Sequence, residues 1–517
     1  MSFCTVLSAA VQGLSVEMIR VEADVSNGLP MFHMVGYLSS EVKEVSERVR
    51  TAIRNSGMKL PAKKIIVNLA PATVRKRGAS FDLPIALAVL AAMNYVPEEA
   101  LKGVAVIGEV SLEGKIRGVS GVLPIVMEAK NQGCTACILP EENEIEGRLV
   151  SGIKILPADN LEKLCAYLNG DEKEIHRKKQ GRSSAQRNIF ENKKEDFSDI
   201  CGQNAVKRAA EIAVAGGHNL LMAGPPGSGK SMIARRIATI LPELSLEESL
   251  EITRIYSVLG MIDKEQPLIT RRPFRSVHHT ITKTALVGGG MTPRPGEISM
   301  AHGGVLFLDE LAEFPRNVLE VLRQPLEEHQ IHIARNYGNF TFPAEFMLVA
   351  AMNPCPCGNY PDMQKCSCTP SQIQKYLGKI SQPFLDRMDL CIETPKVEYR
   401  ELDIERIGKK EEESSEVIRS RVVEARKLQK KRYEGTQIRT NSMLGPGEIR
   451  TYIPLGSAER KLMEKAFERM GLTARTYHKI LRVARTIADL DYSEKVTEKH
   501  LKEAIAYRSL DKKYWGR

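Results

Sequence analysis

The chain has 517 residues, of which 43% are hydrophobic and 27% charged, and its formal net charge is +10. This length predicts two to four domains, each able to bury its own core. No run approaches the ~18 apolar residues of a membrane span, and no basic segment precedes the first apolar residues, so we expect a cytoplasmic protein without a membrane partner. Its ten cysteines are then expected to be thiols or metal ligands. The positive charge permits a polyanionic partner without establishing one.

Residues 1–170 alternate short β-branched runs with helical stretches, which is the pattern of an α/β domain. Runs of the first kind include Ile19–Val25, Ile65–Asn68 and Ala136–Leu139, whereas Ser40–Ser56 and Leu83–Met93 have helical spacing. The following segment, 171–195, is almost wholly polar and charged. Such a segment cannot bury enough surface to fold alone, so we predict a linker. Its basic residues could contact nucleic acid, but a solvated linker is favoured.

Two stretches of the first domain, Lys76–Met93 and Val106–Ala129, resemble the proteolytic domain of Lon-type proteases. The resemblance implies a serine–lysine dyad, with Ser80 near the place of the nucleophile and Leu123 at the place of the lysine. A serine without a base to take its proton is a poor nucleophile. We therefore expect a structural or assembly domain without peptidase activity, with Lys115 as the alternative base.

A glycine-rich segment, Gly224-Pro225-Pro226-Gly227-Ser228-Gly229-Lys230-Ser231, fits the pattern G-x-x-x-x-G-K-[ST]. A short apolar run precedes it and helical spacing follows it, which is the strand–loop–helix context of a phosphate-binding loop. Backbone N–H groups of such a loop cradle phosphate. Lys230 would reach the β- and γ-phosphates and Ser231 would hold Mg²⁺. The alternative is a turn that binds nothing, but the context favours ATP.

A second apolar run, Val305–Leu308, ends in Asp309 and Glu310. This pattern predicts a buried parallel strand that delivers two carboxylates at its C-terminal end, where open α/β sheets bind ligands. Asp309 would order Mg²⁺ through water, and Glu310 would polarise the attacking water as general base. A surface acidic pair is the alternative, and the apolar strand argues against it.

Four cysteines, Cys355, Cys357, Cys366 and Cys368, form the pattern C-x-C-x8-C-x-C. Four thiolates so close together suit tetrahedral Zn²⁺. A reduced, cysteine-rich loop without metal is the alternative. We expect a structural clip that holds a loop rather than a catalytic metal.

Two further segments are longer than nucleotide chemistry requires. Arg271–Met300 carries two adjacent histidines, His278 and His279, and Ile331–Glu345 alternates like a β-hairpin with Tyr337 near its turn. The first segment also holds five basic residues: Arg271, Arg272, Arg275, Lys283 and Arg294. The histidines suggest a metal pair, yet neighbouring side chains point apart and no acidic partner is near, so we expect hydrogen bonds to a polyanion or within the loop.

Residues 196–395 and the charged helical region 396–517 resemble an AAA+ core and lid of the branch that contains magnesium chelatase motors. The run Phe346–Met352 ends at Asn353, where the family places its sensor-1 residue. The segment around Arg387 resembles the family's arginine finger, which neutralises charge in a neighbouring subunit's site. The stretch 472–490, which Thr473 would cap, resembles the sensor-2 helix with Arg475 as the γ-phosphate sensor, Arg482 and Arg485 being alternatives. The two longer segments would then be pore loops.

The order of segments along the whole chain resembles the competence protein ComM family. The most specific parts of this resemblance are the stretches GPPGSGKS, PRPGEISMAHGGVLFLDEL, NPCPCG and VARTIADL. The resemblance implies a multidomain α/β fold with a Lon-protease-like domain, a P-loop core built on a parallel sheet, and a helical lid. It also implies a hexameric, ATP-driven DNA helicase that acts on single-stranded and branched DNA and promotes branch migration during transformation, with recombination proteins as candidate partners. The rival hypothesis is a chelatase-type or chaperone-type motor that remodels a protein partner.

Overall fold

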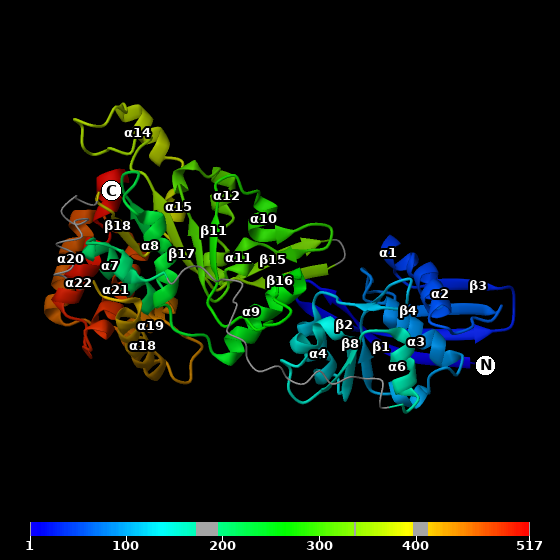
Figure 1. The fold of residues 1–517 in the computed structure, drawn as a ribbon. Helices are drawn as coiled ribbons and strands as arrows, with labels where there is room; N and C mark the ends of the chain where they lie inside the picture. Colours follow the sequence, from blue (N-terminus) through cyan, green and yellow to red (C-terminus); the bar gives the residue numbers. More distant parts are fainter. Residues whose placement is uncertain (1, 172–194, 336–337, 397–411, 516–517) are drawn as a thin grey trace.

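A computed structural model describes residues 2–171, 195–335, 338–396 and 412–515. The chain forms an N-terminal unit, a central motor core and a C-terminal helical region, which follow one another from blue to red in Figure 1. The predicted linker lies outside the described residues except at its two ends, as does Tyr337 in the turn of the predicted hairpin.

The N-terminal unit is built on a seven-stranded mixed sheet of order β3-β4-β2-β1-β5-β8-β9. The side chains of its middle strands point alternately into two hydrophobic cores, one on each face of the sheet, because successive side chains of a strand point to opposite faces. Val104 and Val106 pack on one side with the entirely buried helix α3, and Ala105 packs on the other side with α4. The strands are β1 (Ser2–Gln12), β2 (Ser15–Ser26), β3 (Met31–Val35), β4 (Lys64–Ala70), β5 (Val104–Val106), β8 (Ala136–Pro140) and β9 (Lys154–Ala158), and the main helices are α2 (Val45–Asn55), α3 (Asp82–Ala92), α4 (Val122–Asn131) and α6 (Leu161–Leu168).

The motor core is a five-stranded sheet in which all neighbouring strands are parallel, in the order β11-β14-β17-β10-β18. Strands β10, β14 and β17 are buried throughout, as expected for a parallel sheet covered on both faces. The strands are β10 (Leu220–Ala223), β11 (Phe274–Val277), β14 (Val305–Leu308), β17 (Met347–Met352) and β18 (Leu390–Glu393), and the helices include α7 (Asn204–Gly216), α8 (Lys230–Ile237) and α9 (Leu246–Leu259). This confirms the P-loop core with a parallel sheet.

The basic segment Arg271–Met300 is not a single pore loop, contrary to the expectation from the resemblance, because part of it lies in the central sheet. Its first part forms β11, an edge strand of the central sheet paired with β14. The part after this strand forms α10 (Lys283–Val287), β12 (Gly288–Gly289) and β13 (Arg294–Pro295). It ends in α11 (Glu297–Met300), whose last three residues are buried in the motor core. The predicted hairpin is confirmed as β15 (Gln330–Arg335) and β16 (Gly338–Pro343). We call residues 280–296 the insert.

The C-terminal region is helical, as predicted. It consists of α18 (Ser415–Arg432), α19 (Pro446–Tyr452), α20 (Ser457–Met470), α21 (Ala474–Leu490), α22 (Glu498–Ala506) and α23 (Ser509–Trp515). The Thr473 hydroxyl accepts a hydrogen bond from the backbone N–H of Thr476, which confirms the predicted cap of α21. Among the described residues, no helix combines the length and the apolarity that crossing a membrane requires.

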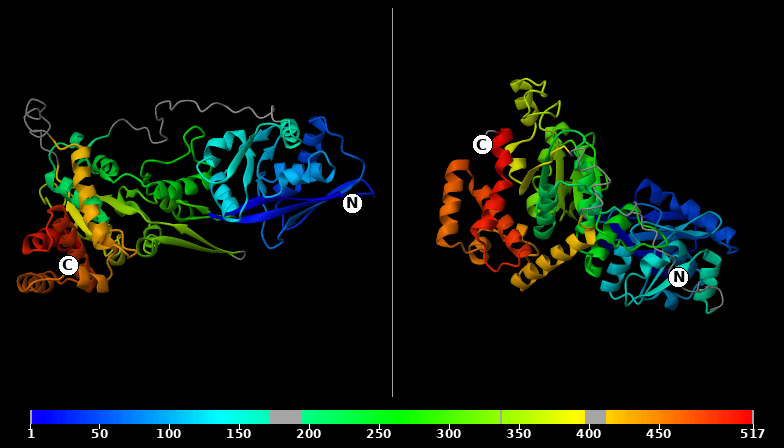
Figure 2. Two further views of the ribbon diagram at one scale, coloured as in Figure 1. Left: turned by 90° about the horizontal axis from the view of Figure 1, so that it is seen from below. Right: turned by 60° about the vertical axis from the view of Figure 1, so that its left-hand side comes forward.

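The turn between β1 and β2 reaches into the motor core (Figure 2). Leu14 is buried with the motor's apolar side chains, and its carbonyl accepts a hydrogen bond from Arg254 on α9. Beside it, Gly13 packs so closely on the β16 hairpin strand that a Cβ there would lie 3.0 Å from Phe340. The backbone N–H of Gly121, before α4, donates to the carbonyl of Ser257 on α9 at 2.9 Å. The N-terminal unit is thus anchored to the motor.

Candidate nucleotide site and cysteine cluster

The phosphate-binding loop connects β10 to α8, at the carboxyl edge of the parallel sheet. Gly224 follows the strand directly, and a Cβ at this position would lie 2.2 Å from the carbonyl oxygen of Thr394. Gly229 caps α8 with a φ of 81°, a left-handed conformation that glycine adopts without strain. The loop therefore presents the free N–H groups of a helix N-terminus, which suit a phosphate.

Lys230 is the first residue of α8, and its side chain contacts the preceding loop. Its ammonium group donates hydrogen bonds to the carbonyl oxygens of Gly224 at 2.7 Å and Pro225 at 2.9 Å. Burial lowers the pKa of Lys230 to about 8, and the nearby carboxylate of Asp309 opposes this shift. Because burial disfavours the charged form of this lysine, an anionic phosphate beside it would be a favourable additional partner.

Asp309 and Ser231 meet although they are far apart in sequence. The hydroxyl of Ser231 donates a hydrogen bond of 2.7 Å to the carboxylate of Asp309. A serine hydroxyl and a carboxylate are oxygen ligands of the kind that Mg²⁺ prefers. The donor set fits this ion, and Ser231 and Asp309 would hold it.

Asn353 completes this group of contacts. It follows β17, and its side-chain oxygen lies 3.3 Å from the ammonium nitrogen of Lys230. The residue at the sensor-1 position of the resemblance is thus within hydrogen-bond reach of Lys230.

Glu310 occupies a left-handed conformation with φ 52°, which is uncommon for residues other than glycine. Its carboxylate oxygen lies 3.3 Å from Nδ1 of His279, and the side chain is 55% exposed. The rings of His278 and His279 are 4.0 Å apart, and the ligand atoms of both histidines and Glu310 lie within 4.8 Å of one another. The prediction that no acidic partner is near the histidines was therefore wrong, because the sheet brings the end of β14 beside the end of β11.

The two arginines predicted to act on the nucleotide, Arg387 and Arg475, lie away from the phosphate-binding loop of their own chain. Arg387 is buried, and its guanidinium group contacts the carbonyl of Pro383 and the carboxylate of Glu327. Arg475 is exposed at the start of α21 and, among the described residues, forms no hydrogen bond or ion pair with the phosphate-binding loop. Its positive charge is close enough to lower the pKa of Arg387, after the larger effect of burial. The structure of one chain brings neither arginine to its own Lys230.

Two of the five basic residues in Arg271–Met300 are engaged inside the motor. Arg272 donates to the carbonyls of Pro242 and Gly303 and pairs with Glu248, whereas Arg275 forms two hydrogen bonds with Glu297 at 2.7 and 2.9 Å. Both guanidinium groups are thus engaged with motor residues around β11, and neither is directed to an external polyanion. The other three basic residues of this segment are exposed: Arg271 before β11, and Lys283 and Arg294 in the insert. Arg335, at the end of β15, is exposed as well.

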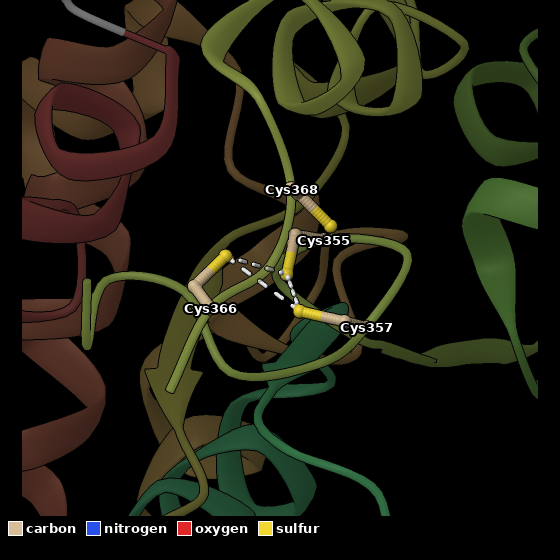
Figure 3. A group of neighbouring side chains, drawn as sticks. All are labelled: Cys355, Cys357, Cys366 and Cys368. Atoms are coloured by element: carbon tan, nitrogen blue, oxygen red, sulfur yellow. Dashed lines mark hydrogen bonds between the residues drawn. The ribbon is translucent and has the colours of Figure 1, made fainter. Parts of the chain in front are cut away.

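The four cysteines converge, as Figure 3 shows. The sulfur of Cys355 lies 3.4 Å from that of Cys357 and 3.8 Å from that of Cys366, and 3.6 Å separates Cys357 from Cys366. The sulfur of Cys368 lies within 4.8 Å of the other three. Tetrahedral zinc with Zn–S bonds of about 2.3 Å requires sulfur atoms about 3.8 Å apart. The donor set and its spacing therefore fit Zn²⁺.

The cysteine loop also touches the phosphate-binding loop. Gly358, with a φ of 79°, packs on Pro226 so closely that a Cβ would lie 2.3 Å from the proline ring. Cys355 is two residues beyond Asn353, which contacts Lys230. Nothing in the chain order shows that the cysteine loop and the phosphate-binding loop meet.

The residues expected at a Lon-type dyad do not form one. Lys115 pairs with Glu113 at 3.2 Å and is exposed, and no hydrogen bond joins it to Ser80 among the described residues. Leu123 is fully buried, and its backbone N–H donates to the carboxylate of Glu146. Sequence reasoning missed Lys76, which is fully buried and donates to the carbonyl of Pro71, and whose pKa burial lowers to about 8.

Glu146 was also missed. It is buried between the N-terminal unit and the motor, where it accepts hydrogen bonds from Leu123 at 2.9 Å and from the Ser257 hydroxyl of α9 at 2.6 Å. Burial raises its pKa, and these hydrogen bonds oppose the shift. The segment that carries the dyad lysine in Lon-type proteases is therefore a contact with the motor in this chain.

Three magnesium chelatase family models match most of the chain. The family model "Magnesium chelatase, subunit ChlI" matches residues 196–402, "Subunit ChlI of Mg-chelatase" matches residues 21–143, and "Magnesium chelatase, subunit ChlI C-terminal" matches residues 412–508. Parts of the N-terminal unit are also similar to Lon proteases. The similarity to Lon protease 2 of Bacillus subtilis is 32% identity over 105 residues, or 20% of this chain and 18% of that protein.

Two relatives cover nearly the full length. The chain is 44% identical to protein YifB of Escherichia coli over 99% of this chain and 98% of that protein. It is 42% identical to competence protein ComM of Haemophilus influenzae over the same shares. The P-loop core on a parallel sheet, the Lon-like first unit and the helical C-terminal region agree with these matches. The chain therefore belongs to the magnesium chelatase-type AAA+ proteins of the competence protein ComM family.

Proposed function

We propose that the protein is an ATPase whose hydrolysis drives movement on DNA. The observation that carries this proposal is the meeting of Lys230 with Asn353 and of Ser231 with Asp309 at one edge of the sheet. Lys230 would bind the phosphates, Ser231 and Asp309 would hold Mg²⁺, and Glu310 would activate water. Asn353 would orient the γ-phosphate or this water. The DNA track is supported by the name of the relative ComM, a competence protein.

The same proposal includes a ring of six copies in the cytoplasm. In a ring, Arg387 would leave its contact with Glu327 and stabilise charge at a neighbouring copy's nucleotide, and Arg475 would contact the γ-phosphate. Arg387→Ala should then bind ATP without hydrolysing it. Mixing it with Lys230→Ala subunits should restore part of the activity, since each variant supplies what the other lacks. Mixtures as inactive as the separate variants would contradict a shared site.

The proposed DNA contacts are the exposed basic side chains Lys283, Arg294 and Arg335. Arg335 reaches the insert, because its Nε lies 3.4 Å from the carbonyl oxygen of Gly290. The insert and the β15–β16 hairpin thus form one projecting surface. Affinity for duplex DNA falls as salt concentration rises. If these side chains neutralise phosphates, each makes the plot of log affinity against log salt steeper by about 0.9.

The deciding experiment is ATP hydrolysis measured with and without single-stranded, duplex and four-way-junction DNA. DNA should stimulate the rate, and ATP should drive migration of the branched substrate. Alanine at Lys283, Arg294 and Arg335 should weaken binding and reduce its salt dependence, whereas alanine at the exposed lid residues Lys461 and Lys495 should not. Absence of both binding and stimulation would favour the rival hypothesis, a motor that remodels a protein partner.

We further propose that Cys355, Cys357, Cys366 and Cys368 hold one structural Zn²⁺. The support is the sulfur spacing described above and the position of the loop beside Pro226. When bound, zinc would fix this loop and would take no part in hydrolysis. We also propose that the N-terminal unit is an assembly unit without peptidase activity, since Ser80 has no lysine partner among the described residues.

A further inference from the structure

We propose that a cavity between the motor core and the C-terminal region binds a small phosphate, and that Arg426 of α18 supplies the positive charge that holds it. The cavity has a volume of about 180 Å³. A single buried water needs about 10–15 Å³, so there is room for a ligand of several atoms. Among the lining residues, Gly304 directly precedes β14 and Met347 is the first residue of β17. The cavity thus lies at the amino ends of the motor strands, whereas the phosphate-binding loop lies at their carboxyl ends.

Two parts of the chain enclose this cavity. The motor contributes α9 and the segments that lead into β11, β14 and β17. The C-terminal region contributes Arg426 and the short turn η7 (Asn441–Met443). A ligand bound here would contact both parts, and it would therefore stabilise the packing of the C-terminal region on the motor.

The acidic side chains that line the cavity already have basic partners. Each carboxylate lies within ion-pair distance of an arginine or histidine that also lines the cavity, so none of these acids is left to neutralise a further cation. The pairs are Glu248 with Arg272 at 3.1 Å, Glu345 with Arg439 at 3.2 Å and Glu251 with His302 at 3.3 Å.

Arg426 is the exception among the arginines of the cavity. Its Nη2 donates a hydrogen bond of 2.7 Å to the carbonyl oxygen of Val214, near the end of α7. Its Nε is buried without an acceptor, and in the described part of the chain no carboxylate forms an ion pair with this guanidinium group. Burial, helped by the nearby positive charge of Arg272, lowers the pKa of Arg426 to about 10. A mostly buried charge without a partner is costly, so an anion in the cavity would be stabilised beside it.

Other polar groups around the cavity favour a phosphate. The hydroxyls of Thr440 and Ser442 lie 2.9 Å apart at η7. The ring of His329, which follows α13 (Pro325–Glu328), also lines the cavity. Burial lowers the pKa of His329, so the ring is neutral at pH 7 and can donate one N–H. Donors from separate elements suit a tetrahedral oxyanion, whose oxygens accept in several directions, better than a planar carboxylate.

The test is binding of inorganic phosphate to the full chain, measured by calorimetry with the Lys230→Ala substitution, which removes the lysine of the phosphate-binding loop. About one phosphate per chain should still bind in this background. Adding Arg426→Gln should weaken the remaining binding by about tenfold or more, because a charge-assisted interaction is lost. Lys427→Gln is the matched control. Lys427 is the next residue of α18, is exposed and pairs with Glu424, so the same charge is removed outside the cavity.

Thermal unfolding with and without phosphate separates ligand binding from a purely structural role of Arg426. In the Lys230→Ala background, phosphate should raise the unfolding temperature, and Arg426→Gln should abolish this gain. If Arg426 only holds the end of α7 through Val214, its substitution should lower stability equally with and without phosphate, which would overturn the inference. Absence of phosphate binding in the Lys230→Ala chain would also overturn it. Succinate at equal ionic strength should bind more weakly, and binding as tight as that of phosphate would refute the preference for a tetrahedral anion.

Discussion

Two sites with a family resemblance lie in this chain, and their geometry differs. In the motor, residues from three separate sequence motifs touch: Lys230 contacts Asn353, and Ser231 contacts Asp309. In the N-terminal unit, the residue at the lysine place is the buried Leu123, and Lys115 pairs with Glu113. The comparison teaches that a shared fold does not preserve a site, because catalysis requires specific side chains in contact.

The largest expected effect is at the motor site. Lys230→Ala should reduce both ATP binding and hydrolysis, and Glu310→Gln should reduce hydrolysis by roughly 100-fold or more while ATP still binds. Nucleotide binding by a fluorescent ATP analogue and phosphate release would measure the two steps. The exposed lid variant Lys465→Ala serves as a control. Turnover of Glu310→Gln within several-fold of wild type would show that another group activates the water.

Ser80→Ala gives the matching test of the N-terminal unit. It should change neither ATP hydrolysis nor turnover of a peptide or casein, since the structure gives Ser80 no base among the described residues. ATP-stimulated cleavage that this substitution abolishes would break the comparison.

Loss of zinc is expected to have the next largest effect. Elemental analysis should find about one zinc per chain, and Cys355→Ser should remove it and lower the free energy of unfolding by about 2 kcal/mol or more. ATP affinity should also fall, because Gly358 of this loop packs on Pro226. Cys201→Ser, outside the cluster, is the control. Metal-free protein purified without chelators would remove the zinc proposal.

Glu146→Ala should destabilise the contact between the N-terminal unit and the motor. The substitution leaves the Ser257 hydroxyl and the Leu123 N–H without their buried acceptor, which costs about 2–3 kcal/mol. Thermal unfolding should show this loss, whereas the exposed residue Glu113 should tolerate alanine. A stability equal to wild type would mean that the carboxylate does not hold the two units together.

Gly358→Ala tests the support of the nucleotide loop without touching a thiol. The added Cβ would lie 2.3 Å from Pro226, so ATP affinity should weaken by about threefold to tenfold while zinc remains bound. Gly435→Ala is a matched control, because Gly435 has the same φ of 79° and a Cβ added there would meet nothing within 4 Å. Equal effects of the two substitutions would assign the loss to backbone strain alone.

A pH-dependent change in stability is expected at the amino end of β10. Burial lowers the pKa of His218 to about 4, from an ordinary value of 6.5. The unfolded chain therefore binds the extra proton first, so stability is complete above about pH 6.5 and falls as pH decreases toward 4, by about 2 kcal/mol near pH 5. Urea denaturation at about pH 7.5 and about pH 5 would measure this difference. His218→Gln should reduce it, whereas the exposed His33→Gln should not.

The sequence by itself determined the motifs whose residues are adjacent. The phosphate-binding loop, the paired acids after an apolar strand and the cysteine spacing are local patterns, and the structure contains the strands, the hairpin and the capped helix that they predicted. Local patterns are reliable here because the strands are apolar throughout and the turns require glycine or proline.

Only the tertiary structure decided which separate segments meet. It placed Arg272 and Arg275 in ion pairs around an edge strand, brought Glu310 beside His279, and packed Gly358 on Pro226. Strand order determines these neighbours, since β14 lies between β11 and β17 although β15 and β16 intervene in the chain. No local pattern encodes that order, because it depends on how the buried faces of all the strands pack together.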